Sequence, residues 1–308
     1  MQLLKNPNFS FMKSRKLFYL VSIIVILVGL ISIIIHKGNK YNIDFTGGLS
    51  MEIAPRPVNG EYMTVSQIRD SLQRNGFIDV EIQELFRTNS FLVKVKSEGG
   101  AGDKIIETLQ SDFPEQTNYE GFIRSQEEVG PRAGADLRAS GLKAIFISLF
   151  LVLIYIWIRY RFTWGFIAAL GLLHDITITL GILSLTGKEI GMTILAALLT
   201  VVGYSINNTI VIFDRIRSNL KLYRKEDDAQ VIDRSINETL NRTIMMTFTT
   251  LIVNLSLMIF GGPVIYDFAF TFFVGIIAGT YSSMLLVTGV VLDSVLAIKK
   301  HKNLTKSK

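Results

Sequence analysis

The sequence contains no cysteine and only three histidines among its 308 residues, which excludes several kinds of site. Without cysteine there is no disulfide, iron–sulfur cluster or cysteine-ligated zinc. His36, His174 and His301 are too far apart in sequence to form a histidine metal motif. We therefore expect neither a metal nor another cofactor.

Signatures of common enzymes are also missing. The chain has no H-E-x-x-H, no G-x-S-x-G and no Walker A loop, the marks of metalloproteases, serine hydrolases and nucleotide-driven machines. We expect a protein that is not an enzyme, and any energy that it uses then comes from a gradient or from a partner.

Apolar sequence is abundant, at 49% hydrophobic residues and a mean hydropathy of +0.38. Six runs can each cross a hydrocarbon core of about 30 Å as a helix. The first run lacks a small-x-small cleavage site before His36 and is expected to remain as an anchor. The runs cover residues 17–35, 140–158, 163–185, 190–213, 243–260 and 268–298.

The net charge of +6 indicates membrane orientation and not nucleic-acid binding, because lysines and arginines gather at the ends of the apolar runs. By the positive-inside rule, residues 1–16, a loop at about 214–242 and the basic tail 299–308 are cytoplasmic. Both termini are then inside, residues 139–298 hold the second to sixth spans, and residues 36–138 lie outside.

The outer segment reads as an α+β domain. Its periodicities alternate in the order β-α-β-β-α-β, with a hairpin turn near residues 87–89, which is the ferredoxin-like order. We thus predict a polytopic α-helical membrane protein with six transmembrane helices and a ferredoxin-like extracytoplasmic domain between the first two. The predicted elements cover residues 41–54, 65–75, 80–86, 90–96, 103–113 and 119–129.

Polar residues inside the spans are costly, at about 2.5 to 3.5 kcal/mol for a charged side chain, and so need a partner, a cavity or a function. His174 and Asp175 lie near the middle of the third span. A histidine beside an aspartate can carry protons. An interhelical hydrogen bond that locks the bundle explains the same pair, and the residue types do not decide between them.

Two further spans carry polar stripes that we expect to face one another in the bundle interior. Close packing by small and hydroxyl residues is the alternative. Arg242, at the start of the fifth span, and the cluster Asp214, Arg215 and Arg217 read as interfacial charges on topology alone. The stripes are Thr200, Gly203, Tyr204, Asn207 and Asn208 in the fourth span, and Thr243, Thr247, Thr250 and Asn254 in the fifth.

Three stretches together resemble the SecF branch of the SecD/SecF protein-export family, in the resistance-nodulation-division superfamily. They are Asp44-Phe45-Thr46-Gly47-Gly48, His174-Asp175-Ile176-Thr177, and Gly203-Tyr204-Ser205-Ile206-Asn207 running on to Asp214-Arg215. The resemblance implies a multi-pass subunit of the bacterial cytoplasmic membrane, with a SecD-like partner, the SecYEG translocon, exported unfolded polypeptide and membrane lipid as its contacts. Flow of protons, or of sodium in some members of the family, would drive movement of the outer domain.

The resemblance also gives residues a role. The important intramembrane arginine of the family matches Arg242. Many family members have aspartate where this chain has Asn208, which cannot titrate, so the proton-binding carboxylate would belong to the SecD-like partner. We therefore hypothesise that an ion path at the interface with the partner is bordered by His174, Asp175, Asn207, Asn208 and Arg242.

Other functions fit less well. A drug or lipid exporter of the same superfamily usually has larger outer domains and a second half in the same chain. A scaffold that only stabilises a translocon predicts that polar substitutions affect assembly alone. An intramembrane hydrolase lacks a nucleophile and base that can be placed on facing helices.

Overall fold

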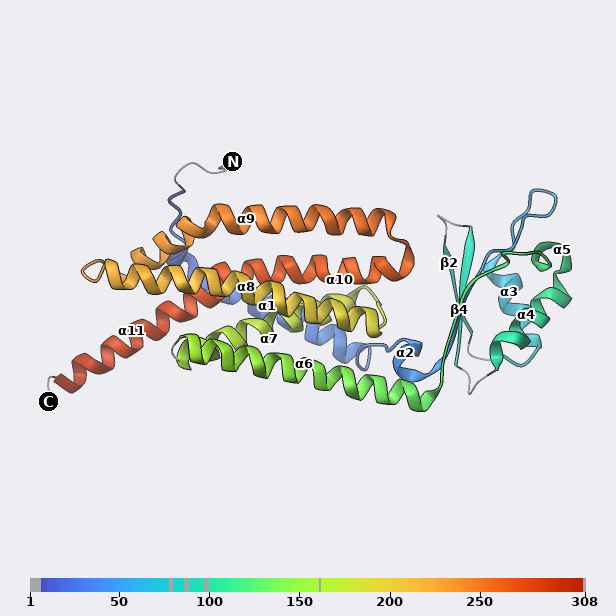
Figure 1. The fold of residues 1–308 in the computed structure, drawn as a ribbon, viewed down its shortest axis with the longest axis horizontal. Helices are drawn as coiled ribbons and strands as arrows, with labels where there is room; N and C mark the ends of the chain where they lie inside the picture. The colour runs from blue at the N-terminus through green and yellow to red at the C-terminus, as the bar shows by residue number, and fades with distance from the viewer. Residues whose placement is uncertain (1–6, 78–79, 86–88, 97–99, 161, 307–308) are drawn as a thin grey trace. The chain divides into compact units, whose positions relative to one another are not determined.

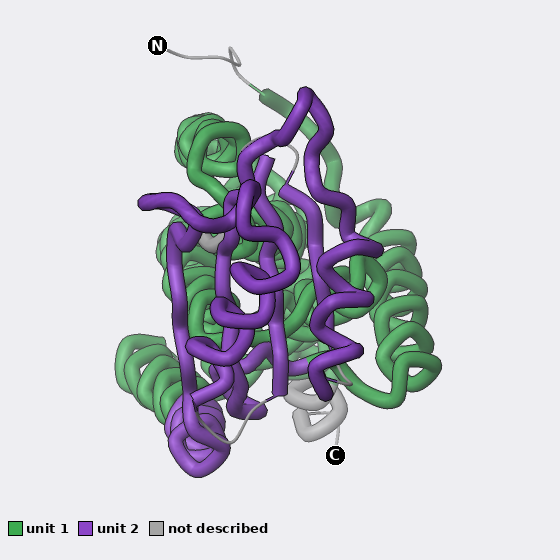
Figure 2. Tube along the Cα trace, turned by 90° about the vertical axis from the view of Figure 1, so that its right-hand side faces the viewer, with its two compact units in different colours: residues 1–40, 143–308 green, residues 41–142 purple. Residues whose placement is uncertain are grey.

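The computed structural model describes residues 7–77, 80–85, 89–96, 100–160 and 162–306. Residues 1–6 and most of the predicted turn at 87–89 fall outside this part of the chain. The chain folds as two units, residues 1–40 with 143–308 and residues 41–142 (Figure 2). We call them the helical unit and the ferredoxin-like unit.

The six predicted spans are confirmed as six helical segments long and apolar enough to cross a membrane (Figure 1). The first joins the short turn η1 (Met12–Ser14) to α1, and the sixth is α10 and α11 joined by a π-helical turn, η2. The helices are α1 (Arg15–Ile35), α6 (Pro131–Arg159), α7 (Phe162–Leu185), α8 (Met192–Leu222), α9 (Asp228–Phe260), α10 (Gly262–Tyr281), η2 (Ser282–Leu286) and α11 (Val287–Lys306).

The fourth and fifth helices are longer than their apolar runs. α8 continues to Leu222 and α9 already begins at Asp228, so most of the segment 214–242 is helical and the connection is short. Both extensions are amphipathic, with Phe213 and Ile216 buried in one cluster with Ile232 and Ile236. Apolar packing between the two helices therefore continues them past the stretch that hydropathy identifies.

α7 and α8 form the centre of the helical unit. About half of each apolar stretch is buried, whereas the apolar stretches of α1, α6 and α9 are largely exposed. α1 crosses α7 at Gly29 and Gly181, where a Cβ atom on Gly29 would lie 2.9 Å from the Gly181 Cα. The backbones touch there, and no side chain fits between them.

Gly181→Ala is expected to lower the stability of the chain in detergent by about 1–3 kcal/mol, because the new Cβ would lie 2.6 Å from the Gly29 Cα. Thermal unfolding of the purified chain measures the effect. Gly203→Ala is the matched control, since a Cβ there meets nothing within 4 Å. Equal stability of the two variants would contradict the close crossing.

Gly275 and Gly279, a G-x-x-x-G in the last span, pack against α8. A Cβ on Gly275 would lie 2.1 Å from a methyl of Val201, and one on Gly279 would lie 3.0 Å from the Ser205 Cβ. The two glycines bring α10 close to α8 beside Ser205. Their role is helix packing.

The β-α-β-β-α-β order of the ferredoxin-like unit is confirmed. Its four strands pair antiparallel in the order β2-β3-β1-β4, and α3 and α4 cover one face (Figure 1). The core alternates along β1, where Leu49, Met51 and Ile53 are buried. The elements are β1 (Gly48–Ile53), α3 (Val65–Arg74), β2 (Val80–Leu85), β3 (Ser90–Val95), α4 (Ala101–Asp112), the short α5 (Pro114–Thr117) and β4 (Ile123–Val129).

The start of this unit differs from the sequence prediction of one strand over residues 41–54. Residues Ile43–Thr46 form a helical turn, α2, whose first amide is capped by the Asn42 side chain at 2.7 Å. Gly47 ends the turn at φ +77, a conformation that other residues rarely adopt. Gly48 then starts β1 so close to β3 that a Cβ would lie 2.6 Å from the Val95 carbonyl oxygen.

Candidate functional site

His174 and Asp175 form a buried polar pair on α7. Their exposed fractions are 6% and 0%. The His174 Nδ1 lies 2.9 Å from the Asp175 Oδ1, so the side chains of two consecutive residues contact each other directly. In this apolar surrounding each polar atom needs a hydrogen-bond partner, and the neighbouring helices supply them.

Three other helices complete this pair. The Ser205 hydroxyl of α8 donates to the Asp175 Oδ2 at 2.6 Å. Ser22 of α1 lies 3.1 Å from the His174 Nε2, and its hydroxyl donates to the Tyr281 hydroxyl of α10 at 3.2 Å. Tyr281 donates in turn to the Phe18 carbonyl at 2.7 Å. We call Ser22, His174, Asp175, Ser205 and Tyr281 the buried network.

Three members of this network were not predicted as site residues, namely Ser22, Ser205 and Tyr281. A weak signal exists in α1, whose buried residues Ser22, Gly29 and Ser32 are small and recur on one face of the helix. Nothing in the local sequence marks Tyr281, because its place depends on how α10 packs against α1 and α7.

The fourth-span stripe divides between two environments. Asn208 is buried and Tyr204 is half-buried, whereas Thr200, Gly203 and Asn207 are exposed in this chain. The predicted facing of the two stripes occurs at one contact, where the Tyr204 hydroxyl donates to the Thr247 Oγ1 at 3.1 Å. Thr247 also contacts Thr280 of α10 at 3.0 Å.

Asn208 has an unmet hydrogen-bonding requirement, as does Asn254 of the fifth-span stripe. Asn208 is 2% exposed, and its Nδ2 has no hydrogen-bond partner among the described residues. It lies one helical turn along α8 from Ser205, which contacts Asp175. Asn208 is therefore buried one helical turn from the residue of α8 that contacts Asp175.

Arg242 and Asn208 lie equally far along their helices from the connection between α8 and α9. Asn208 is fourteen residues before the end of α8, and Arg242 is fourteen residues after the start of α9. Each position is then about 21 Å from the α8–α9 connection. Arg242 is exposed, so it lies well inside α9 on an uncovered face and not at the start of the helix.

The five residues predicted to border an ion path therefore do not form one cluster. His174 and Asp175 are enclosed by this chain, while Asn207 and Arg242 lie on exposed faces of α8 and α9. Asn208 is also buried within this chain, one helical turn along α8 from Ser205. Among the described residues, no group of three histidine or acidic side chains could hold a metal ion.

Asp214 and Arg215 lie farther along α8, towards its end, and form ion pairs. The Asp214 Oδ1 contacts the Arg159 guanidinium of α6 at 3.1 Å, and the Arg215 Nε contacts the Glu238 Oε2 of α9 at 2.5 Å. These partly exposed pairs join neighbouring helices and contribute little stability each.

The Asp44-Phe45-Thr46-Gly47-Gly48 stretch lies in the ferredoxin-like unit, where its role is a turn. Phe45 is buried, and a Cβ on Gly47 would lie 2.6 Å from the Pro131 Cα at the start of α6. A Cβ on Gly134 would in turn lie 3.0 Å from the Gly47 backbone nitrogen. The stretch thus packs the α2 turn directly against the first turn of α6.

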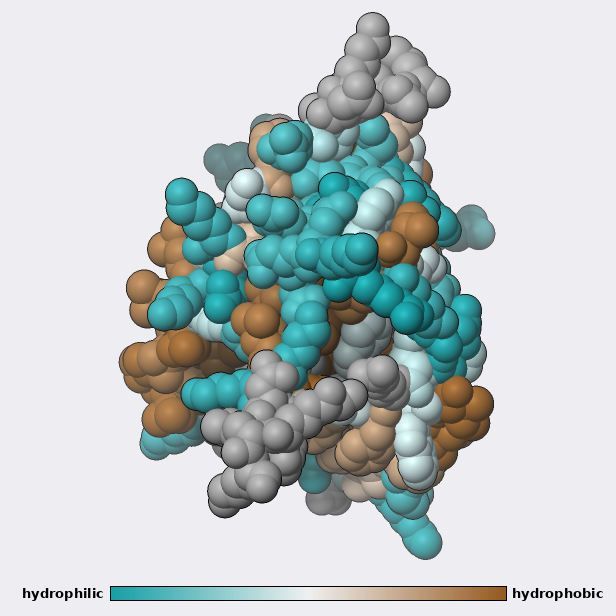
Figure 3. Space-filling model, turned by 90° about the vertical axis from the view of Figure 1, so that its left-hand side faces the viewer, coloured by the Kyte–Doolittle hydropathy of each residue, from teal (hydrophilic) through white to brown (hydrophobic). Residues whose placement is uncertain are grey.

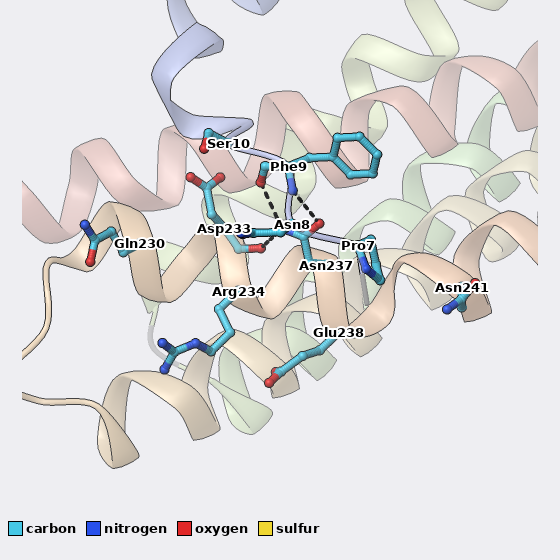
Figure 4. Close-up of a pocket in the computed structure, with 10 residues that line it drawn as sticks. All are labelled: Pro7, Asn8, Phe9, Ser10, Gln230, Asp233, Arg234, Asn237, Glu238 and Asn241. Carbon is cyan, nitrogen blue, oxygen red and sulfur yellow. Dashed lines mark hydrogen bonds between the residues drawn. The ribbon is translucent and has the colours of Figure 1, made fainter. Parts of the chain in front are cut away.

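A second polar site lies where residues 7–10 run along α9 (Figure 4). The Asn237 side chain accepts from the Phe9 amide at 3.0 Å and donates to the Phe9 carbonyl at 2.8 Å. Asp233 accepts from the Met12 amide at 2.9 Å, which caps the start of the first helix. A polar cavity of about 610 Å³ adjoins these contacts.

Asn237→Ala is expected to weaken the attachment of this N-terminal segment by about 1–2 kcal/mol, because two hydrogen bonds to Phe9 are lost. Faster hydrogen exchange of the Phe9 amide in Asn237→Ala would show the weaker attachment. Gln230→Ala, which alters an exposed residue of the same cavity, is the control. Equal exchange in both variants would contradict the attachment.

Comparison with known proteins agrees with this architecture. The family model "Protein export membrane protein SecD/SecF, C-terminal" matches residues 110–296. The protein translocase subunit SecF of Desulfurispirillum indicum is 41% identical over 90% of this chain and 89% of its own. That of Rickettsia rickettsii is 36% identical over 93% and 92%.

A solved structure extends the agreement to the fold. SecDF of Thermus thermophilus, described as a translocon-associated membrane protein, superposes with a TM-score of 0.82 at 36% identity. The match covers 97% of this chain, which spans 40% of the SecDF chain. With six apolar helices, a ferredoxin-like unit between the first two and these relatives, the chain belongs to the SecD/SecF family of protein-export membrane proteins, as a SecF translocase subunit.

Proposed function

We propose that this chain pairs with a SecD-like subunit in the bacterial cytoplasmic membrane and assists export of unfolded polypeptide through the SecYEG translocon. A proton gradient drives motion of the extracytoplasmic domain, residues 36–138. The observation that carries the proposal is the buried His174–Asp175 pair, held by contacts from α1 and α8. Buried titratable groups in a membrane bundle are expensive to keep and typically serve ion or proton transfer.

The proposed orientation puts both termini in the cytoplasm. The end of the helical unit that holds the α8–α9 connection carries much hydrophilic surface (Figure 3). Arg217, Lys221, Arg224 and Lys225 are among its residues, and short basic segments stay on the cytoplasmic side. An even number of spans returns the C-terminus to the side of the N-terminus, with residues 36–138 outside.

The exposed faces of α8 and α9 support a partner-binding role. Thr200, Gly203 and Asn207 recur three and four residues apart, which is the spacing of small residues at close helix contacts. Arg242 is exposed at the depth of Asn207 and Asn208. A carboxylate of the partner placed there would pair with Arg242.

The driving force is sufficient for a single site. One elementary charge that crosses a potential of 100 mV yields about 2.3 kcal/mol. One titrating position in the complex can therefore be driven even though Asn208 itself does not titrate.

Arg242→Gln is expected to remove most of the gradient-dependent part of export, because a buried partner carboxylate would lose its counter-charge. The assay compares export into vesicles that contain both subunits, with and without an ionophore. Arg217→Gln, a basic residue near the end of α8, is the matched control. An ionophore effect of unchanged size in Arg242→Gln would remove this residue from coupling.

One observation favours a second function for the buried network. Every polar side-chain atom of His174 and Asp175 has a described partner, as in a structural lock that holds α1, α7, α8 and α10 together. The lock predicts that substitutions lower subunit levels and export in proportion. Coupling predicts normal subunit levels with loss of the gradient effect alone.

A further inference from the structure

The direction of each hydrogen bond in the buried network determines which of its groups carry a proton. The Tyr281 hydroxyl lies 2.7 Å from the Phe18 carbonyl oxygen. A carbonyl only accepts, so the phenol proton is committed there. The Ser22 hydroxyl, 3.2 Å from the Tyr281 oxygen, must then be the donor in that contact.

The state of His174 follows from Ser22. Because the single proton of Ser22 is directed at Tyr281, its oxygen must accept at its other contact, from the His174 Nε2 at 3.1 Å. The Nε2 therefore carries a hydrogen. On the other side of the ring, the Nδ1 lies 2.9 Å from the Asp175 Oδ1. A bare ring nitrogen and a carboxylate are both acceptors, so this contact requires a further proton.

We infer that His174 and Asp175 together bind one proton in this arrangement of the helices. The proton lies between the Nδ1 and Oδ1, either as an imidazolium beside a carboxylate or as a neutral imidazole beside a carboxylic acid. In both forms the pair has no net charge, which suits side chains that are 6% and 0% exposed. The ligand of the site is the proton itself.

The groups around the pair are neutral in the described contacts. α1 contributes Ser22, α8 contributes Ser205, and α10 contributes Tyr281, whose ring stacks with that of His174 at a centroid distance of 6.3 Å. No lysine, arginine or other acid among the described residues forms an ion pair with either group. The proton is therefore what compensates the charge of Asp175.

Release of this proton changes a contact between helices. When the pair loses one of its two protons to water, the proton that remains lies on Nδ1 and donates to the ionised Asp175, and Nε2 becomes an acceptor. Ser22 then turns its hydroxyl to Nε2 and no longer donates to Tyr281. The lost bond joins α1 to the last residue of α10, immediately before the π-helical turn η2, a kind of turn common at functional sites.

This inference deepens the proposed function and rests on it only for the proton as driving ion. Nitrogen-15 NMR of labelled histidine in the full complex in lipid tests it. With His36→Gln and His301→Gln, His174 is the single histidine of this chain, and an unlabelled partner keeps its spectrum unobscured. At neutral pH we expect the Nε2 to carry hydrogen. A bare Nε2 there would overturn the inference.

Two variants sharpen the test. Tyr281→Phe frees the Ser22 hydroxyl to donate to Nε2, so the fraction of His174 with a bare Nε2 should rise. Ser32→Ala is the control, because Ser32 is also a buried serine of α1 that contacts α7, at Ser184 2.9 Å away, outside the network. An Nε2 signal unchanged by Tyr281→Phe, or changed equally by Ser32→Ala, would overturn the inference.

The outcome for the proposed function is separate. A protonated Nε2 together with normal gradient-dependent export in Asp175→Asn would retain the proton site and reject the coupling role. A bare Nε2 together with loss of gradient-dependent export in Asp175→Asn would reject the proton site and retain the coupling role.

Discussion

Asp175→Asn is expected to abolish the gradient-dependent part of export while leaving the subunit in the membrane at normal levels. The asparagine amide keeps the shape of the side chain and an oxygen that can accept from Ser205, now 2.6 Å from the carboxylate. It cannot share a titratable proton with His174. We expect the ionophore-sensitive fraction of export to fall at least about tenfold, equivalent to roughly 1.4 kcal/mol.

The measurement compares export into vesicles of both subunits with the gradient intact and collapsed. Asp293→Asn is the matched control, because Asp293 is also an aspartate of a long apolar helix but contacts Arg15 and Tyr19 outside the network. Loss of export in proportion to loss of subunit from the membrane would favour the structural lock and reject coupling.

Gly203→Leu is expected to separate this chain from its SecD-like partner. A Cβ on Gly203 meets nothing within 4 Å in this chain, so the chain itself accommodates the larger side chain. On the proposed contact face the same side chain would keep a partner helix away. We expect co-purification of the two subunits to fall at least about tenfold, which corresponds to roughly 1.4 kcal/mol.

Co-purification from membranes in mild detergent measures this effect, with the yield of each subunit scored separately. Thr163→Leu enlarges an exposed residue near the start of α7 and serves as the control. If Gly203→Leu retains the partner as well as the control does, α8 does not contact the partner at this position.

Much of the fold follows from patterns that depend on neighbours in the sequence. Apolar runs of membrane-spanning length predict all six spans, and alternation predicts the strands that form the sheet. The prediction is wrong at residues 43–46, where a side-chain cap and a glycine at positive φ favour a helical turn. It also ends α8 early, because packing against α9 continues the helix beyond the apolar run.

The candidate site was less predictable than the fold. His174, Asp175, Asn208 and Arg242 stand out because each is a costly residue in an apolar stretch. Which of them meet depends on which helices pack together. Ser22 and Ser205 are ordinary hydroxyl residues in sequence, and only the crossing of α1 and α8 with α7 brings them to the buried pair.

The sequence by itself determined the number of spans, the ferredoxin-like order and the candidate polar residues, because hydropathy and periodicity act over short stretches of chain. The tertiary structure alone decided that His174 and Asp175 are enclosed while Asn207 and Arg242 remain exposed. It also decided the direction of the hydrogen bonds that place a proton on the pair. The physical reason is that burial and hydrogen-bond partners are properties of packed helices, and residues as distant in sequence as Ser22 and Tyr281 become neighbours only when those helices pack.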